Sequence, residues 1–296
     1  MGSIKGFVWN CGGLTRTAAS TSSKVMYFED SFKNNFDFFF FLETHHKNKN
    51  DIPNELKRYE DTHYIEHSPR DINNAYTGII GVIRKEYKIM DVQQIIEGRI
   101  TYYISAVYFP TNNKFEIEYM QNIVQKLRLP TNEDTAHHLI IGDFNFIDHE
   151  KDKKNGMNTK DKKLNKIWIP FLEEMDMVDP FREQNPKRKI WSFIGGGVAG
   201  NSRIDRIYVN SFNMKDITKI RYINTPFYGH KIMAFNIENN TEWGKSYYKL
   251  NTSLFEDEEY DNIVDETINE VETLSNRTAN QKWETFMMTM KTKSIE

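Results

Sequence analysis

Short apolar runs alternate with polar turns along residues 1–240, and their spacing predicts most of the secondary structure. Runs rich in β-branched and aromatic side chains, bounded by turn residues, indicate strands. The runs that predict strands are Ile4–Trp9, Phe38–Leu42, Tyr59–Glu66, Gly78–Arg84, Lys88–Ile96, Thr101–Tyr108, His138–Gly142, Ile204–Val209, Ile217–Ile223 and Lys231–Ile237.

Three other segments place apolar side chains at helical spacing and predict helices. They are Ser23–Asn35, Phe115–Leu129 and Lys163–Met177, and Pro130 is expected to end the second. Strands and helices are mixed along the chain without a regular β-α-β alternation. That order favours an α/β protein built in layers, with mixed or mainly antiparallel sheets.

The composition changes after Ile237, and from Leu254 onwards the chain is acidic and helix-prone. Apolar side chains available for packing recur there at Phe255, Ile263, Ile268, Val271 and Leu274. We predict one domain over residues 1–240 and a helical tail over residues 241–296 outside it. The alternative is that this segment is simply the last helix of the same domain.

The composition indicates a globular protein, with 39% hydrophobic and 14% aromatic residues. The single cysteine, Cys11, leaves no intramolecular disulfide and fits a reducing compartment. The longest apolar run, Phe38–Leu42, is far shorter than a membrane span, and no signal-peptide core opens the chain. We therefore expect an intracellular protein, nuclear or cytoplasmic, that is neither secreted nor membrane-bound. The formal net charge of −3 argues against strong non-specific nucleic-acid binding but not against a DNA enzyme.

Candidate chemistry lies at the ends of the apolar runs, where layered α/β folds build their sites. Asn10 ends the first run and precedes Gly12 and Gly13, a context in which an Asn is commonly only a turn residue. Glu43 follows the apolar run Phe38–Leu42 directly. A carboxylate at the mouth of a buried strand needs a partner, and a magnesium ion is one that suits it. A salt bridge at the end of the strand is the alternative.

Asp143 and Asn145 give the strongest single signal. They follow Gly142 after a buried run, and residues two apart in an extended segment project to the same side. A carboxylate there can accept a proton from water while the neighbouring carboxamide orients a phosphate. An ordinary turn is the alternative.

Asp205 lies inside an apolar predicted strand, and a buried Asp needs a hydrogen-bond partner. His230 can supply one, in which case Asp205 fixes the tautomer of the imidazole and raises its pKa. A lone His is more often structural, but the buried Asp favours a catalytic pair.

Six motifs in this order resemble those of the endonuclease/exonuclease/phosphatase superfamily, whose members have a DNase I-like fold. The motifs are Trp9–Leu14, Glu43-Thr44, Tyr108–Pro110, Gly142–Asn145, Ser202–Asp205 and His230. The resemblance covers roughly residues 4–237. It implies a four-layer α/β sandwich, in which two mainly antiparallel or mixed sheets are flanked by helices.

Two segments narrow the resemblance further. Ser202–Ile207, after Trp191–Phe193, is similar to the endonuclease domains of non-LTR (LINE-type) retrotransposons. Tyr248–Asn251 resembles the segment that follows the endonuclease in those elements, ahead of an acidic helical linker and a reverse transcriptase. The resemblance thus implies a Mg²⁺-dependent (or Mn²⁺-dependent) endonuclease that nicks double-stranded DNA and leaves a 3′-hydroxyl to prime reverse transcription. We expect a monomer that was joined to, or works with, a reverse transcriptase segment.

The resemblance also assigns roles. Glu43 is expected to be the main metal ligand, with Asn10 nearby. Asp143 is expected to orient or deprotonate the attacking water. Asn145 and Tyr108 are expected to hold the scissile phosphate.

In the same family pattern, His230, supported by Asp205, stabilises charge on the phosphoryl oxygens. Ser192 and Arg203 are expected to bind the substrate. Six basic residues are expected to contact DNA phosphates, or alternatively to form a solvated basic face. They are Arg182, Lys187, Arg188, Lys189, Arg203 and Arg206. The Gly-rich loop Ile194–Asn201 holds no Lys or Arg, so we expect weak sequence preference from a minor-groove contact there.

Three positions depart from the family pattern. Tyr228 and Gly229 stand where the family has Ser and Asp, and Gly12 stands where some relatives place a metal ligand. We expect reduced activity from the missing acidic group. The alternatives are an inactive remnant that still binds DNA, or a related phosphatase or abasic-site endonuclease.

Overall fold

The computed structural model describes residues 3–15, 21–32, 36–71, 76–86, 88–89, 94–97, 100–109, 111, 116–128, 136–195, 200–227, 229–238, 258–274 and 279–293. The chain divides into two compact units, residues 1–240 and residues 241–296. Several positions with sequence-based expectations lie outside the described residues. These are Pro110, Pro130, Tyr228, Tyr248–Asn251 and Phe255.

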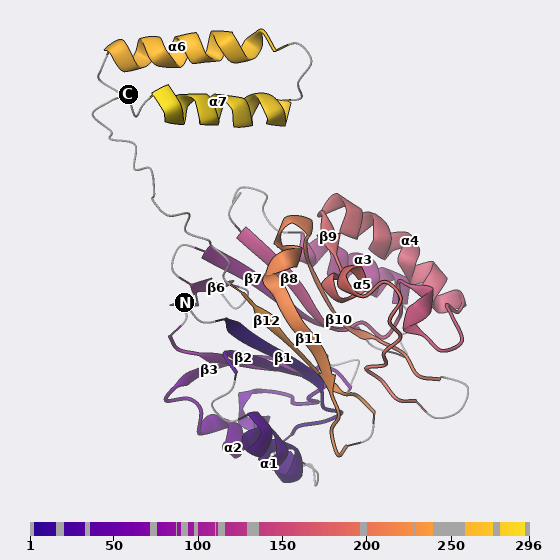
Figure 1. Ribbon diagram of the computed structural model, residues 1–296. Coiled ribbons are helices and arrows are strands. Elements are labelled where there is room, and N and C mark those ends of the chain that lie inside the picture. The colour runs from indigo at the N-terminus through magenta and orange to yellow at the C-terminus, as the bar shows by residue number, and fades with distance from the viewer. Residues whose placement is uncertain are drawn as a thin grey trace. The chain divides into compact units, whose positions relative to one another are not determined.

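Two six-stranded sheets form the first unit (Figure 1). The first sheet has the order β11 (Ile217–Ile223), β12 (Ile232–Ile237), β1 (Ile4–Asn10), β2 (Phe38–Leu42), β4 (Ile79–Arg84) and β3 (His63–Ser68). The second has the order β5 (Lys88–Ile89), β6 (Gln94–Glu97), β7 (Ile100–Tyr108), β8 (Ala136–Asp143), β10 (Asp205–Asn210) and β9 (Met177–Val178). Both sheets are mixed, because β1–β2 and β7–β8 pair in parallel and the other pairs are antiparallel.

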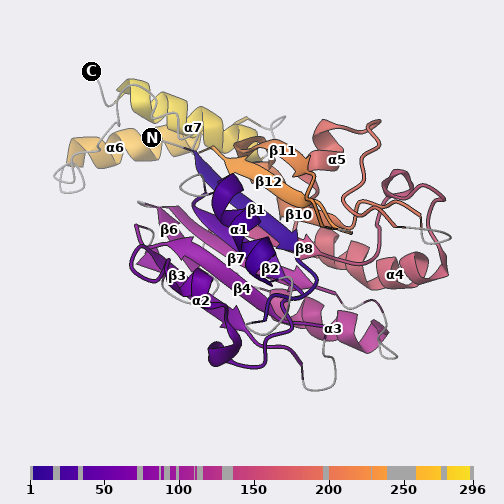
Figure 2. The same ribbon diagram turned by 90° about the horizontal axis from the view of Figure 1, so that it is seen from below.

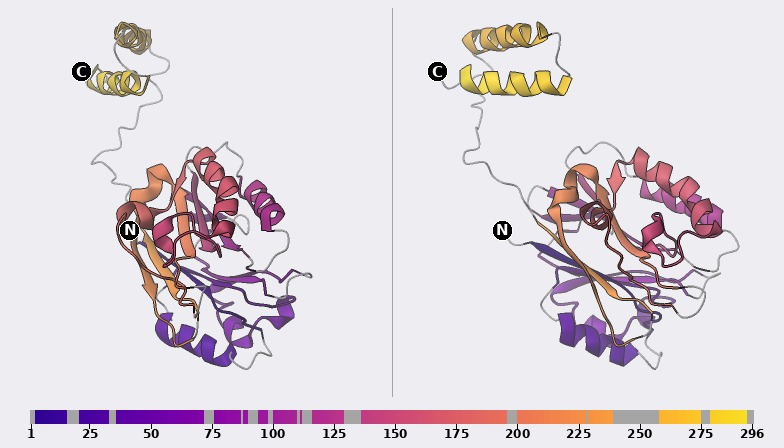
Figure 3. Two further views of the ribbon diagram at one scale, coloured as in Figure 1. Left: turned by 90° about the vertical axis from the view of Figure 1, so that its right-hand side faces the viewer. Right: turned by 45° about the vertical axis from the view of Figure 1, so that its right-hand side comes forward.

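Helices cover the outer faces of the two sheets (Figures 2 and 3). α1 (Thr21–Phe32) and α2 (Asn54–Lys57) pack on the first sheet through an aromatic cluster that includes Phe28, Phe39 and Phe41. α3 (Glu116–Leu127) and α4 (Thr159–Glu174) pack on the second around Trp168. The short α5 (Pro180–Gln184) follows β9.

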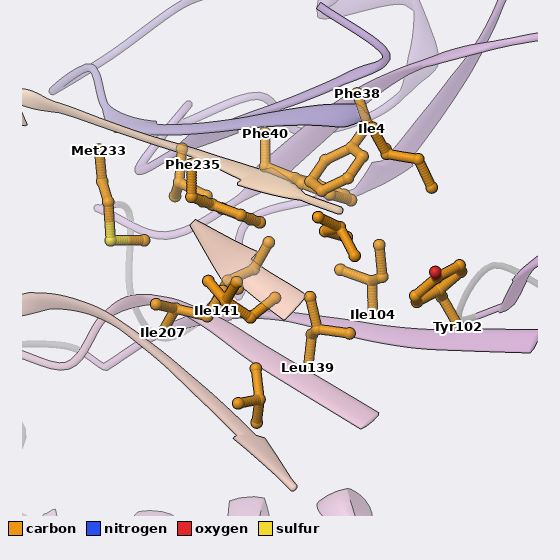
Figure 4. Packing of buried hydrophobic residues seen from close by; sticks show 14 of the residues in the cluster. Ile4, Phe38, Phe40, Tyr102, Ile104, Leu139, Ile141, Ile207, Met233 and Phe235 are labelled. Atoms are coloured by element: carbon orange, nitrogen blue, oxygen red, sulfur yellow. The ribbon is translucent and has the colours of Figure 1, made fainter. Parts of the chain in front are cut away.

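A third apolar cluster fills the space between the sheets (Figure 4). Phe40 and Phe235 from the first sheet meet Ile141 and Ile207 from the second. Strands that are apolar on both faces can serve both an outer and an inner cluster, as Phe38–Leu42 does. The layers are therefore helix, sheet, sheet and helix, as the resemblance implied.

Local structure shifts several predicted boundaries. β3 begins at His63 rather than Tyr59, because turns follow α2 over residues 58–62. The predicted strand Lys88–Ile96 is divided into β5 and β6. α4 begins before the predicted Lys163, because Asn158 and Asp161 form a capping box at its start.

The second unit consists of α6 (Glu258–Glu272) and α7 (Ala279–Lys293), which lie side by side. Lys293 and Glu270 form an ion pair between them at 3.0 Å. In the described part of the chain, no helix combines the length and apolar character needed to cross a bilayer.

Candidate active site

Strand register brings the candidate residues to one end of the two facing sheets. β1 and β2 are parallel and in register, so Asn10 and Glu43 emerge from neighbouring strand ends. In the second sheet, Tyr108 at the end of β7 pairs with Asp143 at the end of the parallel β8. Asp205 opposes Asp143 from the antiparallel β10. The site is thus assembled from both sheets.

Asn10 connects the two halves of the site. Its Nδ2 donates to Oε2 of Glu43 at 2.8 Å and to Oδ2 of Asp143 at 2.8 Å. Its Oδ1 accepts from the backbone N–H of Gly12 at 3.1 Å. The carboxamide therefore turns its NH₂ group toward both carboxylates and its oxygen away from them. In this orientation Asn10 holds the Glu43 carboxylate in place by a hydrogen bond, and its own oxygen is not directed to a cation at Glu43.

Glu43 is the most exposed of the three candidate carboxylates, with 21% of its side chain accessible. It is hydrogen bonded to the hydroxyl of the buried Tyr108, and Nε2 of His45 lies 3.4 Å from its Oε1. Burial raises the pKa of Glu43, but the bonds from His45 and Asn10 outweigh that effect and hold the pKa below its usual value. Glu43 is therefore ionised at neutral pH. One ionised, accessible carboxylate fits a hydrated divalent cation such as Mg²⁺, which commonly binds one or two carboxylates and keeps several waters.

Asp143 lies at the buried centre of the site. Its Oδ1 accepts from the backbone N–H of Asn145 at 2.9 Å, and its Oδ2 accepts from the side-chain Nδ2 of Asn145 at 3.1 Å. That Nδ2 also donates to the carbonyl oxygen of Phe109 at 2.7 Å. Asp143 has no exposed surface, so it meets solvent only through the polar groups around it.

His230 bridges Asp205 and Asp143. Its Nδ1 lies 2.9 Å from Oδ2 of Asp205, and its Nε2 lies 3.7 Å from Oδ2 of Asp143. Burial lowers the pKa of His230, but the two carboxylates raise it further, to about 9. Burial raises the pKa of Asp143 to about 7, against the opposing effect of His230. At neutral pH, a positively charged imidazole therefore lies between two carboxyl groups.

The three side chains Asp143, Asp205 and His230 also lie close enough to hold a metal, with candidate ligand atoms within 4.8 Å of one another. The short Nδ1 contact to Asp205 requires a shared proton, however, which a metal on that nitrogen would displace. This geometry suits proton and charge handling better than metal binding, and Glu43 is the more accessible carboxylate for a cation.

Ser192 and Arg203 do not lie where a substrate could reach them. Ser192 is fully buried, and its hydroxyl accepts the backbone N–H groups of Ile204 and Asp205, each at 3.0 Å. Arg203 is fully buried and donates to Asp152 and Asp179. Both expectations of direct substrate contact are corrected, because these side chains fix the chain just before and at Asp205.

Two other basic residues are likewise buried. Arg182 pairs with Asp152, and Arg206 pairs with Asp148 at 3.0 Å while lying over the ring of Phe144. They form neither phosphate contacts nor a solvated face. Sequence could not show this, because the partner carboxylates come from distant loops.

Lys187, Arg188 and Lys189 are exposed and remain available for DNA phosphates. The charge of the chain is also unevenly distributed. Residues 1–240 carry 33 Lys and Arg against 30 Asp and Glu, whereas residues 241–296 carry 6 against 12. The unit that holds the site is thus net positive, although the whole chain has a formal net charge of −3.

Sequence reasoning missed two residues of the site. His45, two positions after Glu43, contacts its carboxylate. Lys24 donates to backbone carbonyl groups next to Asn10. Its signal was present in the sequence, because Lys24 lies on the same helical face as the apolar Val25, Phe28 and Phe32.

Known proteins share this sequence pattern and fold. Residues 7–243 match the model of the endonuclease/exonuclease/phosphatase family. Over 193 residues, the chain is 24% identical to a Xenopus laevis protein described as "Transposon TX1 uncharacterized 149 kDa protein". That match covers 61% of this chain and only 14% of the relative.

Solved structures show the same architecture. The AP endonuclease LMAP from Leishmania major has a TM-score of 0.64 at 13% identity, over 80% of this chain and 88% of that one. The 3′ phosphatase NExo from Neisseria, bound to a product DNA hairpin, has a TM-score of 0.58 at 14% identity, over 79% and 99% of the two chains. At such identities the likeness shows the fold, and it confirms the predicted DNase I-like sandwich.

Proposed function

Because this chain belongs to the endonuclease/exonuclease/phosphatase family, we propose that residues 1–240 nick double-stranded DNA by hydrolysis that depends on Mg²⁺ or Mn²⁺. The family assignment confirms the resemblance that the six sequence motifs indicated. The observation that carries the proposal is the Asn10 carboxamide, which joins an accessible, ionised Glu43 to Asp143 and the His230–Asp205 pair. Residues from both sheets are held together there by donors and acceptors suited to a phosphodiester.

DNA is the substrate that the remaining observations favour. The unit carrying the site is net positive, and Lys187, Arg188 and Lys189 are exposed on it. One structural neighbour is described as bound to a DNA hairpin, and the sequence relative is a transposon protein.

Glu43, held by Asn10 and Tyr108, is the residue that would bind the cation. When bound, a divalent cation polarises phosphoryl oxygens and neutralises charge on the leaving oxygen. Asn145 and Tyr108 hold the scissile phosphate in our proposal. The Asn145 carboxamide donates its two N–H bonds to Oδ2 of Asp143 and to the carbonyl oxygen of Phe109, so it would exchange one of these acceptors for a phosphoryl oxygen.

Two groups handle protons and charge. His230, positively charged between Asp205 and Asp143, stabilises negative charge on the phosphoryl oxygens. Asp143 orients or deprotonates the attacking water, and a pKa near neutral suits a general base.

The biological reaction we propose is the nick that leaves a 3′-hydroxyl for reverse transcription in LINE-type retrotransposons. The transposon relative supports it. In this proposal the acidic helical tail, residues 241–296, corresponds to the linker ahead of a reverse transcriptase segment.

The test is nicking of supercoiled plasmid in Mg²⁺, with products checked for extension by a DNA polymerase. Glu43→Ala and His230→Ala should each lose at least about 100-fold in rate, since each removes a charge-stabilising group. The exposed Glu60→Ala, away from the site, is the matched control and should nick like the natural protein. Unchanged nicking by Glu43→Ala would overturn the assigned site.

Gly229 and Gly12 favour a second candidate, a weakened or inactive member of the family that still binds DNA. Both positions lack the acidic or amide side chain expected there. A Mg²⁺-dependent rise in melting temperature that Glu43→Ala abolishes, without nicking, would identify this case. The same assay on a duplex with an abasic site, and on a 3′-phosphate end, tests the related abasic-site endonuclease and phosphatase activities.

A further inference from the structure

Lys24 is a buried cation beside the proposed active site. It lies in α1 with only 6% of its surface exposed. Its ammonium donates to the carbonyl oxygens of Gly12 and Gly13, at 2.9 Å each. Among the described residues, no carboxylate lies within salt-bridge distance of it. Burying a charge without an opposite charge is costly. The backbone groups that Lys24 contacts therefore indicate which part of the structure it stabilises.

The two glycines that Lys24 contacts form a turn, and this turn is hydrogen bonded to both Asn10 and Glu43. The N–H of Gly12 donates to Oδ1 of Asn10 at 3.1 Å, which sets the orientation of that carboxamide. The N–H of Gly13 donates to the carbonyl oxygen of Glu43 at 2.7 Å. The two N–H groups of the turn thus face the site, and its two carbonyl groups face Lys24.

This turn has little stiffness of its own. Gly12 and Gly13 have φ angles of 54° and 96°, and two successive glycines leave the backbone many other conformations. A charged donor that holds both carbonyl groups selects one of them, because charge-assisted hydrogen bonds are stronger than neutral ones.

We infer that Lys24 is a positioning residue, which holds the Gly12–Gly13 turn in the conformation that orients Asn10 and Glu43. Its effect on cation binding and nicking rests on the proposed function. Its effect on the turn does not, and the two can be measured separately.

The first measurement is amide hydrogen exchange in the metal-free protein. Lys24→Met keeps an unbranched side chain and removes the donors. Val25→Ala, at the fully buried neighbouring position, weakens α1 packing and removes no hydrogen bond to the carbonyl groups of the turn, so it is the matched control. We expect Lys24→Met to speed exchange at Gly12 and Gly13 about tenfold or more, and Val25→Ala to leave it unchanged. Equal exchange in Lys24→Met and the natural protein overturns the inference, as does equal acceleration by Val25→Ala.

The second measurement follows Mg²⁺ through the shift in melting temperature and through kcat for plasmid nicking. Lys24→Met should need about tenfold more Mg²⁺ for half of the shift and should lower kcat, whereas Val25→Ala should match the natural protein below its unfolding temperature. Natural Mg²⁺ dependence and kcat in a Lys24→Met protein with a loosened turn would overturn the effect on the site.

Two further outcomes are decisive. If the natural protein neither responds to Mg²⁺ nor nicks DNA, the proposed function fails, while hydrogen exchange still decides the role of Lys24 in the turn. If Lys24→Met does not fold, Lys24→Gln takes its place, because its carboxamide keeps neutral donors. Its turn should then exchange faster than that of the natural protein, and equal exchange would overturn the inference.

Discussion

Glu43 and Asn145 have left-handed backbones, with φ of 54° and 51°. Such a conformation costs a residue such as Glu about 1 kcal/mol or more and persists only where the surroundings impose it, whereas Asn and Asp adopt it more readily. The Gly13 N–H holds the carbonyl of Glu43, and the Asp143 carboxylate holds the backbone of Asn145. At the residue scale, backbone strain at Glu43 therefore coincides with the side chain that we place against the cation.

Gly12 and Gly229 should differ in how they tolerate the acidic residue that relatives carry. Gly12 has φ of 54° and no atom within 4 Å of an added Cβ, and Asp accepts that region readily. Gly229 has φ of 108°, which side chains rarely adopt, although an added Cβ would only touch Phe193 at 3.7 Å. We predict that Gly12→Asp lowers the free energy of unfolding by less than about 1 kcal/mol and Gly229→Asp by about 1–3 kcal/mol, measured by urea denaturation.

On activity, Gly12→Asp should increase nicking at limiting Mg²⁺ by adding a carboxylate near Glu43. Equal stability of the two variants would contradict the backbone argument. If the natural protein nicks as fast as both variants, the missing acidic groups do not matter.

At the scale of elements, β10 depends on buried charge pairs. Arg203 precedes this strand and binds Asp152 and Asp179, and Arg206 within the strand binds Asp148. Ser192 adds two hydrogen bonds to the backbone at the start of β10. Asp205 thus reaches His230 from a strand end that is fixed by groups from several distant loops.

Asp152→Asn should be among the most damaging single changes outside the site. It leaves Arg203 and Arg182 buried with less than their full charge compensation, which typically costs about 3–5 kcal/mol of unfolding free energy. The control is Asp176→Asn, because Asp176 is exposed and its carboxylate accepts only from the hydroxyl of Ser211 among the side-chain contacts of the described residues. Its cost should stay below about 1 kcal/mol. Similar urea midpoints for the two variants would contradict this account.

At the scale of the whole molecule, the two units carry opposite charge. Residues 1–240 have an excess of basic side chains, and residues 241–296 an excess of acidic ones. All site residues and all three core clusters belong to the first unit, as far as the chain is described.

Truncation after Asn240 should therefore leave a folded unit that keeps the proposed nicking activity. Its melting transition should stay within about 3 °C of the full chain, since a shift of that size corresponds to less than about 1 kcal/mol. Its nicking rate at low salt should be equal or higher, because an acidic segment is removed. Aggregation of the truncated chain, or loss of nicking, would show that the tail is part of the folded unit.

Stability should fall as the pH drops from 6.5 toward 4. Burial lowers the pKa values of His46 and His138 from 6.5 to about 4. Between these pH values the two side chains are therefore protonated in the unfolded chain and neutral in the folded protein. The contribution is complete above pH 6.5 and is lost on acidification, by up to about 1.4 kcal/mol per pH unit for each His. Asp143 works in the opposite direction over part of this range, because its pKa is raised.

A difference measurement isolates one group. His138→Gln removes the titration of His138, so the unfolding free energy of the variant should depend less on pH between 6.5 and 4 than that of the natural protein. Parallel pH curves would mean that His138 is not held neutral in the fold.

The sequence by itself determined the architecture and marked several of the residues that meet in the proposed site. Apolar runs such as Phe38–Leu42 pack on both faces wherever they are placed, so their positions predicted the strands. Glycines and polar side chains at the ends of these runs marked Asn10, Glu43, Asp143 and His230, because strand ends are where layered α/β folds build their sites.

Only the tertiary structure decided which charges face solvent. Arg203 and Lys187 look alike in the sequence, but one is buried against Asp152 and Asp179 and the other is exposed. Ser192 and Lys24 likewise acquire their roles from backbone groups on other segments. The physical reason is that hydrogen bonding and desolvation act between neighbours in space, and the partners here are 11 to 51 residues apart along the chain.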